Sequence, residues 1–474
     1  MKLEYLAFFF AYLVLLLTVS FIFSKKMKNF EDFFLASRRL PAFLVFLTLG
    51  ASWLGATSIL VSTDEAFNLG VSAFWVMGGP AILTVFVFYF FLARPIREMP
   101  VLSLPDMVEI SYGRTVRHLA SALIVWYMIL LAASQMVAAG NIIKSFLGTS
   151  YFYGLLLGTS IVLIYSIFGG FFSVVITDGF QFFLLIAGLS CLLGFLLGRT
   201  GLADVSLTAS QLGRREYFSI FAGLERNGLM VLSFTLAWII SPIAWQRIQA
   251  AQTVQKARTG LLAAGGTFAL VFCCIIFIGM LSLPLFPSGH QEGSLLTALI
   301  LSKTHLALGV LLFVAIVAAI MSTMDTAINT GALSLVRDVY QQLFPSRRFD
   351  IIKVSRMATV AVGVLAFLIA TKLQVILKTL GLASEIMAEG LFIPGMAMLF
   401  LKKPRPAAGL LALIMGGGYS LLGFLCQIDV LPLQWPDWPH SVPYGLGLCL
   451  AGFAAGWVID SFFRRGARPD RKMQ

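Results

Sequence analysis

The chain consists of long apolar segments separated by short polar ones. A helix needs about 20 apolar residues to cross a bilayer, and only helices and closed barrels satisfy their backbone polar groups there. The pattern predicts thirteen transmembrane helices, at residues 4–24, 40–63, 71–93, 116–146, 150–168, 171–198, 228–247, 260–286, 307–336, 354–371, 376–401, 406–427 and 443–463. The expected fold class is an all-α polytopic membrane protein.

The composition agrees with this prediction and excludes other classes. Of the 474 residues, 59% are hydrophobic and 12% are charged, against roughly 45–50% and about 25% in soluble domains. Disorder requires the opposite balance, and a secreted disulfide scaffold requires cysteines in polar loops. The five cysteines lie in apolar runs without zinc-ligand spacing, so no disulfide or structural metal is expected. They are Cys191, Cys273, Cys274, Cys426 and Cys449.

The net charge of +12 indicates membrane topology, because the basic residues do not gather on a polar face suited to nucleic acid. Lys and Arg collect in cytoplasmic loops. With the segment 25–39 in the cytoplasm, 25 of the 34 basic residues fall on that side. They lie in 25–39, 94–117, 247–258, 337–356, 402–405 and 464–472. The amino terminus is then outside and the carboxyl terminus inside.

The chain is predicted to form one transmembrane domain, since no polar stretch is long enough for a second. The first span has a long apolar run followed by lysines and no small-residue cleavage site, so a retained helix is expected rather than a signal peptide. The largest polar insert, 199–227, has apolar residues at helical spacing and predicts a short extracellular amphipathic helix. The basic tail 464–474 is expected to be solvated or to contact lipid headgroups.

One face of the ninth span is rich in oxygen-bearing side chains. Polar groups inside membrane spans are costly and mark functional sites. This face carries Ser322, Thr323, Asp325, Thr326, Asn329 and Thr330, beside Ala319. Oxygen ligands suit a hard cation such as sodium. The alternative is that small and hydroxyl residues only allow close helix packing, and the carboxylate of Asp325 makes that explanation the weaker one.

Two glycines, Gly50 and Gly55, lie among hydroxyl residues in the middle of the second span. They weaken the helix, and unwound backbone at this depth is tolerated where it lines a cavity. Its freed carbonyls are then available to a cation. Close packing of another helix against the glycines is an equal alternative.

Two other spans carry carboxylates. Asp178 follows Gly170 by eight residues, which places it about 12 Å into the membrane. It needs a cation, a proton or a partner, and pairing with Lys or Arg is the weaker alternative because none is predicted at its depth.

Glu385 and Glu389 precede Pro394 in the eleventh span. They either line a substrate path or are partly solvated near the outer end.

Together these residues resemble the sodium:solute symporters, which include the bacterial proline, pantothenate, sugar and sialic acid carriers and the choline carrier. The resemblance covers most of the chain. Residues 33–38 resemble the family's FFLAGR, residues 65–70 its GEAYxxG, residues 169–181 its GG…TDxxQ, residues 246–260 its QRxLAAxxxxxARRG, and residues 319–326 its AAxMSTADS. In this order and on these spans the motifs are specific.

The resemblance implies the LeuT-like fold, with five helices (about 40–198) repeated upside down by the next five (about 228–401). One span precedes the repeats and two follow, at 406–463. Family members bind sodium between the first and eighth core helices. At the matching positions the ligands are the carbonyls of Ala51, Leu54 and Ala319 and the hydroxyls of Ser322 and Thr323. A second sodium ion or a proton is expected at Asp178, Ser322, Asp325 and Thr326.

The solute is not specified by these motifs. Trp53 stands where many members have Asn or Asp, and Ser58 where the sugar carriers have Gln, so a sugar-type polar site is not expected. The candidate pocket residues are Trp53, Ser58, Phe74, Trp75, Gln135, Trp238 and Glu385. A largely apolar lining favours a small, partly hydrophobic or zwitterionic solute.

The expected function is sodium-coupled import of a small organic solute by alternating access, performed by a monomer in a bacterial inner membrane. Sodium is the coupling ion, and no organic cofactor is expected. The alternatives are a proton-coupled carrier of the same fold and a solute-binding receptor without net transport. An enzyme is not expected, because the histidines lie at span edges or in loops without a zinc or nucleophile constellation. They are His118, His290, His305 and His440.

Overall fold

The structure, a computed structural model, describes residues 3–24, 38–55, 57–99, 101, 103–168, 171–289, 293–344, 350–401 and 403–466. Within these ranges every element is a helix, apart from an isolated pairing of Leu40 with Ala251. The all-α fold class is confirmed. Residues 33–37, Gly169, Gly170, His290 and the tail from residue 467 lie outside the described residues.

Helices occur throughout both halves of the chain. The first half forms α1 (Leu3–Ser24), α3 (Ala42–Trp53), η2 (Thr57–Val61), α4 (Ser62–Leu69), η3 (Gly70–Ala73), α5 (Phe74–Val87), η4 (Phe88–Leu92), α6 (Ala93–Arg97), α7 (Leu104–Tyr112), α8 (Arg114–Leu147), α9 (Tyr151–Phe168), α10 (Phe171–Leu197) and α11 (Leu202–Gln211). The second half forms α12 (Leu224–Ile239), α13 (Pro242–Ala250), α14 (Val254–Leu281), η5 (Leu283–Leu285), α15 (Leu295–Ser302), α16 (Leu306–Ser334), η6 (Leu335–Tyr340), α17 (Gln341–Leu343), α18 (Ile351–Lys372), α19 (Ile376–Glu385), η7 (Ile386–Leu391), α20 (Phe392–Ala397), α21 (Pro406–Ala412), η8 (Leu413–Gly417), α22 (Gly418–Gln427) and α23 (Val442–Gly466).

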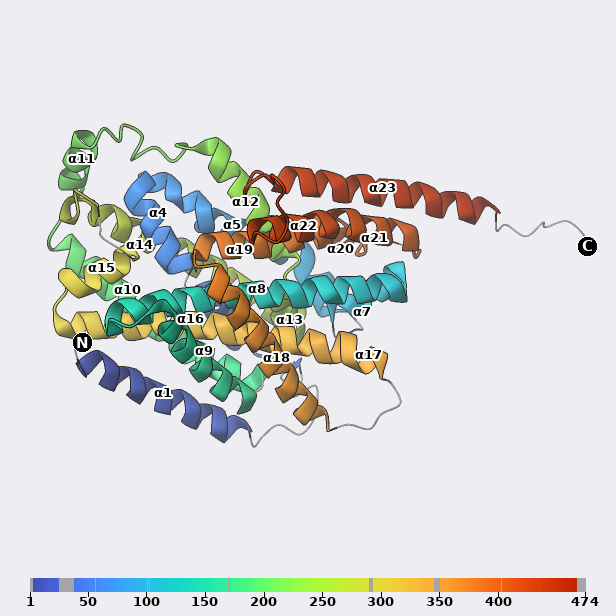
Figure 1. Ribbon diagram of the computed structural model, residues 1–474, viewed down its shortest axis with the longest axis horizontal. Coiled ribbons are helices and arrows are strands. Elements are labelled where there is room, and N and C mark those ends of the chain that lie inside the picture. Colours follow the sequence, from blue (N-terminus) through green and yellow to red (C-terminus); the bar gives the residue numbers. More distant parts are fainter. Residues whose placement is uncertain are drawn as a thin grey trace, which may run out of the picture.

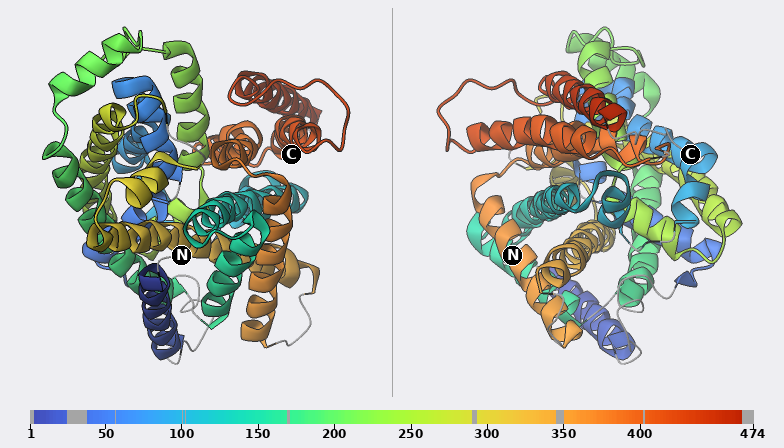
Figure 2. Two further views of the ribbon diagram at one scale, coloured as in Figure 1. Left: turned by 60° about the vertical axis from the view of Figure 1, so that its left-hand side comes forward. Right: turned by 90° about the vertical axis from the view of Figure 1, so that its right-hand side faces the viewer.

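Eight helices of the described chain are long and apolar enough to cross a membrane, or nine if the bent pair α12 and α13 counts as one span. The centre is formed by α16, which packs against α8, α10 and α18. Figure 1 shows α1 along one edge of the molecule and α23 along the opposite edge. The last helices, α21 to α23, lie outside the main bundle (Figure 2). The start of α1 and the end of α23 lie at opposite ends of the molecule (Figure 1).

The second predicted span breaks at Gly55, whereas Gly50 lies inside α3. Helix α3 ends at Trp53, and the chain becomes helical again at Thr57. Added Cβ atoms show why glycine is needed there: one on Gly50 would lie 2.7 Å from the ring of Phe182, and one on Gly55 would lie 2.4 Å from Oγ1 of Thr323. Both sequence interpretations therefore hold, since the span is interrupted and its glycines admit close neighbours.

The predicted span 228–247 also breaks, which the sequence analysis did not anticipate. Helix α12 ends at Ile239 and α13 begins at Pro242, with a bend of 43° between them. Proline is favoured in the first turn of a helix because its missing N–H has no partner to lose there. The sequence analysis placed Arg247 in a cytoplasmic loop, but it lies on α13 and is fully buried.

The polar insert 199–227 contains the predicted short helix, α11. Val205 and Ala209 are buried while Leu207 is exposed, so one face of α11 packs on the molecule. Thr200, just before it, donates a hydrogen bond to the carbonyl of Leu281 at 2.9 Å, which ties the insert to the end of α14.

Candidate ion and solute site

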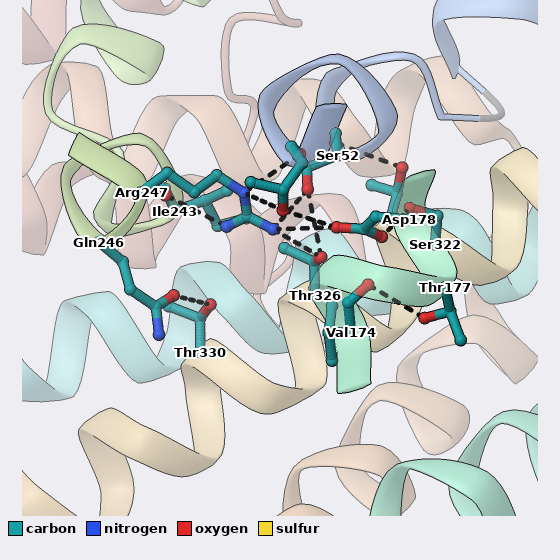
Figure 3. Close-up of polar contacts among 12 residues, drawn as sticks. Ser52, Val174, Thr177, Asp178, Ile243, Gln246, Arg247, Ser322, Thr326 and Thr330 are labelled. Atoms are coloured by element: carbon teal, nitrogen blue, oxygen red, sulfur yellow. Dashed lines mark hydrogen bonds and ion pairs between the residues drawn. The ribbon is translucent and has the colours of Figure 1, made fainter. Parts of the chain in front are cut away.

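Polar side chains from α3, α10, α13 and α16 meet in the middle of the molecule (Figure 3). Asp178 of α10 accepts hydrogen bonds from Oγ of Ser322 at 2.5 Å and from Oγ1 of Thr48 at 2.8 Å. All three side chains are buried. The structure thus brings two residues of the expected second cation or proton site, Asp178 and Ser322, into direct contact beside α3.

Arg247 joins this cluster, and the sequence analysis missed it. Its Nη2 lies 3.6 Å from Oδ2 of Asp178 and donates hydrogen bonds to Oγ of Ser52 at 2.5 Å and Oγ1 of Thr326 at 3.0 Å. The expectation that no basic residue shares the depth of Asp178 is wrong. The reason is the break at Ser241, which turns α13 into the core. The sequence Ser241-Pro242, typical of a helix start, was the available signal.

Each nitrogen of the Arg247 guanidinium donates a hydrogen bond to an oxygen acceptor. Nε donates to both oxygens of Thr48, at 3.2 and 3.1 Å, and Nη1 donates to the carbonyl of Ile243 at 3.2 Å. A buried ion pair loses several kcal/mol of hydration per ion, so it persists only where further hydrogen bonds surround both charges. The Arg247–Asp178 pair meets that condition.

The other two members of the expected second site, Thr326 and Asp325, contact different helices. Thr326 lies 3.3 Å from Oγ of Ser52 and shares the network of Arg247. Asp325 instead accepts a hydrogen bond from Ser166 of α9. Tyr165, also on α9, donates to the carbonyl of Met321 at 3.1 Å. Helix α9 therefore supports α16 on the side of Asp325.

The expected sodium ligands lie where α16 meets the break after α3. Oγ1 of Thr323 lies 3.3 Å from the carbonyl of Ser52, with Gly55 directly beside it. The three residues expected to contribute carbonyls are buried, at 3, 0 and 3% exposure for Ala51, Leu54 and Ala319. Carbonyls at the end of a helix, such as those of Ala51 in the last turn of α3 and Leu54 just after it, lack intrahelical partners. Ala319 instead lies inside α16. Hydroxyl and carbonyl oxygens of this kind fit sodium.

Aromatic rings form a stack beside the same break. The ring of Trp53 lies 5.7 Å from that of Trp238 and 5.6 Å from that of Phe268, and Trp238 stacks on Phe234 at 5.5 Å. Offset stacking at these centroid distances is favourable. The stack joins α3, α12 and α14.

Two polar candidates for the solute pocket also lie at the break. Ser58 donates a hydrogen bond to the carbonyl of Trp53 at 2.6 Å. Gln135 of α8 is fully buried, and its amide nitrogen lies 3.4 Å from Oγ1 of Thr57. The structure therefore brings Trp53, Ser58, Gln135 and Trp238 to one region.

Other candidates for the pocket lie elsewhere. Trp75 donates its indole N–H to the carbonyl of Ile220 at 2.9 Å, and Phe74 packs edge-on against Trp75 at 5.6 Å. Trp75 is thus fixed to the segment before α12.

The carboxylates of the eleventh span are covered by α23. Glu385 is 4% exposed and accepts a hydrogen bond from Ser441, just before that helix, and Glu389 is fully buried. The alternative that these carboxylates are partly solvated is wrong, because α23 packs over them.

A cavity of about 1060 Å³ lies beside η2, the helical segment that follows the break. It is lined by Leu60 of η2, Asp64 and Glu65 of α4, Lys144 of α8 and Thr297 of α15. Figure 1 shows α4 and α15 at the end of the molecule where α1 begins. The polar and charged side chains that line the cavity suit the passage of a hydrated solute.

These features define a class of protein. A broken helix beside a buried charge cluster, in an apolar all-helical fold, is the arrangement of an ion-coupled membrane transporter. Residues 33–416 match the sodium:solute symporter family, and the chain belongs to that family.

Curated relatives and solved structures are consistent with this assignment. The chain is 24% identical to a sodium/proline symporter of Staphylococcus aureus, over 76% of this chain and 73% of that protein. It is 25% identical to the high-affinity proline transporter PutP of Bacillus subtilis (strain 168), over 75% of this chain and 78% of the relative. A sodium-coupled sialic acid symporter in a substrate-bound, outward-open state has a similar fold, with a TM-score of 0.82, 18% identity and 99% coverage of both chains. MhsT in complex with L-phenylalanine is more distant, with a TM-score of 0.51, 15% identity and coverage of 89 and 98%.

The family assignment establishes the general activity. The protein is a transporter rather than an enzyme, sodium is its coupling ion, and no organic cofactor is required. Its partners are therefore sodium, a solute and the lipid bilayer.

Proposed function

We propose that the protein imports a small, partly apolar or zwitterionic solute together with sodium, and that amino acids such as proline are the first candidates. The observation that carries the proposal is the contact between α16 and the break after α3. There, Thr323 reaches the carbonyl of Ser52 at 3.3 Å, and only a glycine at position 55 leaves room for it. A site shared by two helices couples ion binding to their separation.

In this proposal the sodium ion is held by oxygens from both helices. Ser322 and Thr323 supply hydroxyls from α16, and the carbonyl of Ala319 comes from the same helix. The carbonyls of Ala51 and Leu54 come from the interrupted second span. Sodium bound between them favours the arrangement in which α3 and α16 touch, and its release allows the helices to part.

We propose that the solute binds beside the stack of Trp53, Trp238 and Phe268. The stack offers a flat apolar wall, while the amide of Gln135 and the hydroxyl of Ser58 offer polar contacts. A few fixed polar groups in a mostly apolar pocket give orientation and specificity to a small ligand. The two curated relatives named above transport proline, which combines an apolar ring with a zwitterionic backbone.

The proposed topology has thirteen spans, with the amino terminus outside and the carboxyl terminus inside a bacterial inner membrane. The first repeat covers about 40–198 and the second about 228–401, and the protein acts as a monomer. The start of α1 and the end of α23 at opposite ends of the molecule support an odd number of spans. In this topology the cavity of about 1060 Å³ opens to the outside, where the solute enters.

The first experiment tests the sodium site without a known solute. In the purified protein, the sodium concentration for half-maximal thermal stabilisation is measured for wild type, Ser322→Ala and Thr323→Ala. We expect at least about a tenfold increase in each variant, which corresponds to about 1.4 kcal/mol per lost ligand. Ser334→Ala, on the same helix but three turns from the break, is the control and should match wild type. Wild-type sodium dependence in both site variants would refute the proposed ligands.

A second experiment tests the solute. Proteoliposomes with an inward sodium gradient are given radiolabelled proline, other amino acids, organic acids, sialic acid and quaternary amines. We expect accumulation of an amino acid that disappears when choline replaces sodium. Binding without accumulation would indicate a receptor, and accumulation independent of sodium would contradict symport.

A further inference from the structure

A second acidic site lies outside the ion site, where η7 passes between α8, α12 and α23. Glu385 and Glu389 are four residues apart and are 4 and 0% exposed. Ser441 donates a hydrogen bond to Oε1 of Glu385. In the described part of the chain, neither carboxyl oxygen of Glu389 has a hydrogen-bond partner.

Helix α23 lies directly on the carboxyl group of Glu389. A Cβ atom on Gly445 would come within 2.4 Å of Cδ and Oε2 of Glu389, so only a glycine fits there. The thiol of Cys449, one turn further along α23, donates to the carbonyl of Gly390 at 3.7 Å. The part of α23 that faces Glu389 therefore offers backbone and a thiol, without a side-chain oxygen.

The charges around the pair are negative or absent. Asp437 acts electrostatically on Glu385, and Tyr419 of α22 acts on both carboxyl groups. Cys449 of α23 acts on Glu389, and Tyr444 of α23 acts on Tyr419. Among the described residues no cation acts on either carboxyl, and α8, α12 and η8 add no titratable group that does. An ionised Glu389 would be a buried charge without a hydrogen bond or a counterion, which is among the costliest arrangements in a protein interior.

We propose that Glu385 and Glu389 form a proton-binding site, in which Glu389 carries a proton while α23 packs on η7. A metal ion is disfavoured because hard cations take several oxygen ligands, and neither Gly445 nor Cys449 has a side-chain oxygen. Loss of the proton would press a negative charge against Gly445, beside a second carboxyl that repels it. Helix α23 must then move away or admit water. The site makes the packing of the last helix dependent on pH, and it does not rest on the sodium ligands.

The experiment compares wild type, Glu389→Gln and Glu216→Gln in lipid nanodiscs. Glutamine keeps the shape of a neutral carboxyl group, and Glu216, which is exposed in the segment before α12, serves as the matched control. We expect the unfolding midpoint of wild type to fall from neutral to alkaline pH, and that of Glu389→Gln to lose this fall. Glu216→Gln should behave like wild type. Equal pH dependence in wild type and Glu389→Gln would overturn the proposal.

Infrared spectroscopy of the wild-type protein gives a second readout that needs no folded variant. A protonated buried carboxyl group has a carbonyl stretch that an ionised one lacks. We expect this band to disappear over the same alkaline interval in which the unfolding midpoint falls, and a band that persists throughout would contradict the proposal. Adding sodium in place of choline should stabilise wild type and Glu389→Gln equally. Sodium stabilisation that is reduced in Glu389→Gln would instead identify a cation site.

Discussion

At the residue scale, Arg247 occupies the position between Asp178, Ser52 and Thr326. Two carboxylates in a low-dielectric site, Asp178 and Asp325, cannot both remain charged without a compensating cation or proton. The guanidinium compensates one of these two negative charges, that of Asp178, from within the chain. We therefore infer that it takes the place of the second sodium ion or proton that the sequence predicts near Asp178.

This inference gives a prediction about stability. Arg247→Gln leaves Asp178 buried without its partner, and breaking such a pair costs about 3–5 kcal/mol. We expect a strongly lowered unfolding midpoint for Arg247→Gln and recovery of most of the loss in Arg247→Gln/Asp178→Asn. The exposed pair of Arg94 and Glu98 is the matched control, since exposed ion pairs contribute about 0–1 kcal/mol. Additive losses in the double variant would mean that the pair does not interact.

At the element scale, the sequence predicts one of the two helix breaks and not the other. Glycine in mid-span commonly serves either unwinding or close packing. Gly55 marks the first break, and Gly50 admits the ring of Phe182. The second break interrupts an apolar run at only two positions, Ser241 and Pro242, so a pattern based on apolar residues runs through it. Because the break is not recognised, Arg247 falls at the end of a predicted span and is assigned to a loop.

Side-chain partners were harder to predict than elements. The oxygen-rich face of α16 follows from helical periodicity, which fixes neighbours along one helix. Periodicity does not identify the helix that packs against this face. Only the structure shows that Ser166 donates a hydrogen bond to Asp325 and that α23 packs on Glu389. Contacts between distant segments depend on packing that a single periodic pattern does not encode.

The close approach of α16 to the first break gives a prediction at this scale. Gly55→Ala would place a methyl group 2.4 Å from Oγ1 of Thr323, which forces α16 away from the ion site. We expect the sodium-dependent thermal stabilisation to be lost or shifted by at least about tenfold in concentration. Gly194→Ala on α10 meets nothing within 4 Å and should match wild type. An unchanged sodium response in Gly55→Ala would show that this contact does not form the site.

At the scale of the whole molecule, orientation is predicted by the basic residues. Of the 25 in the predicted cytoplasmic segments, 24 remain on that side once Arg247, which is buried in the core, is left out. We expect a green fluorescent protein fused after residue 474 to be fluorescent and an alkaline phosphatase fused there to be inactive, because the phosphatase folds only outside the cytoplasm. A phosphatase fused within the turn segment 212–223 should be active. The opposite readouts would overturn the thirteen-span orientation.

The number of ions per solute depends on the charge balance of the entire ion site. Because Arg247 neutralises Asp178, we expect one sodium ion per transported solute. At −100 mV one ion contributes about 2.3 kcal/mol electrically, and a tenfold sodium gradient adds about 1.4 kcal/mol. The sum supports roughly 500-fold accumulation, whereas two ions would roughly square that ratio.

Uptake into proteoliposomes decides between these stoichiometries. We expect a Hill coefficient for sodium near one in wild type and in Asp178→Asn, with the variant less stable because Arg247 loses its counterion. A coefficient near two in wild type that falls to one in Asp178→Asn would show a second sodium ion beside Arg247. First-order sodium dependence with strong pH dependence would indicate a proton instead. Repeating the pH series in Glu389→Gln assigns that proton, because a dependence that survives the substitution belongs to the ion site rather than to η7.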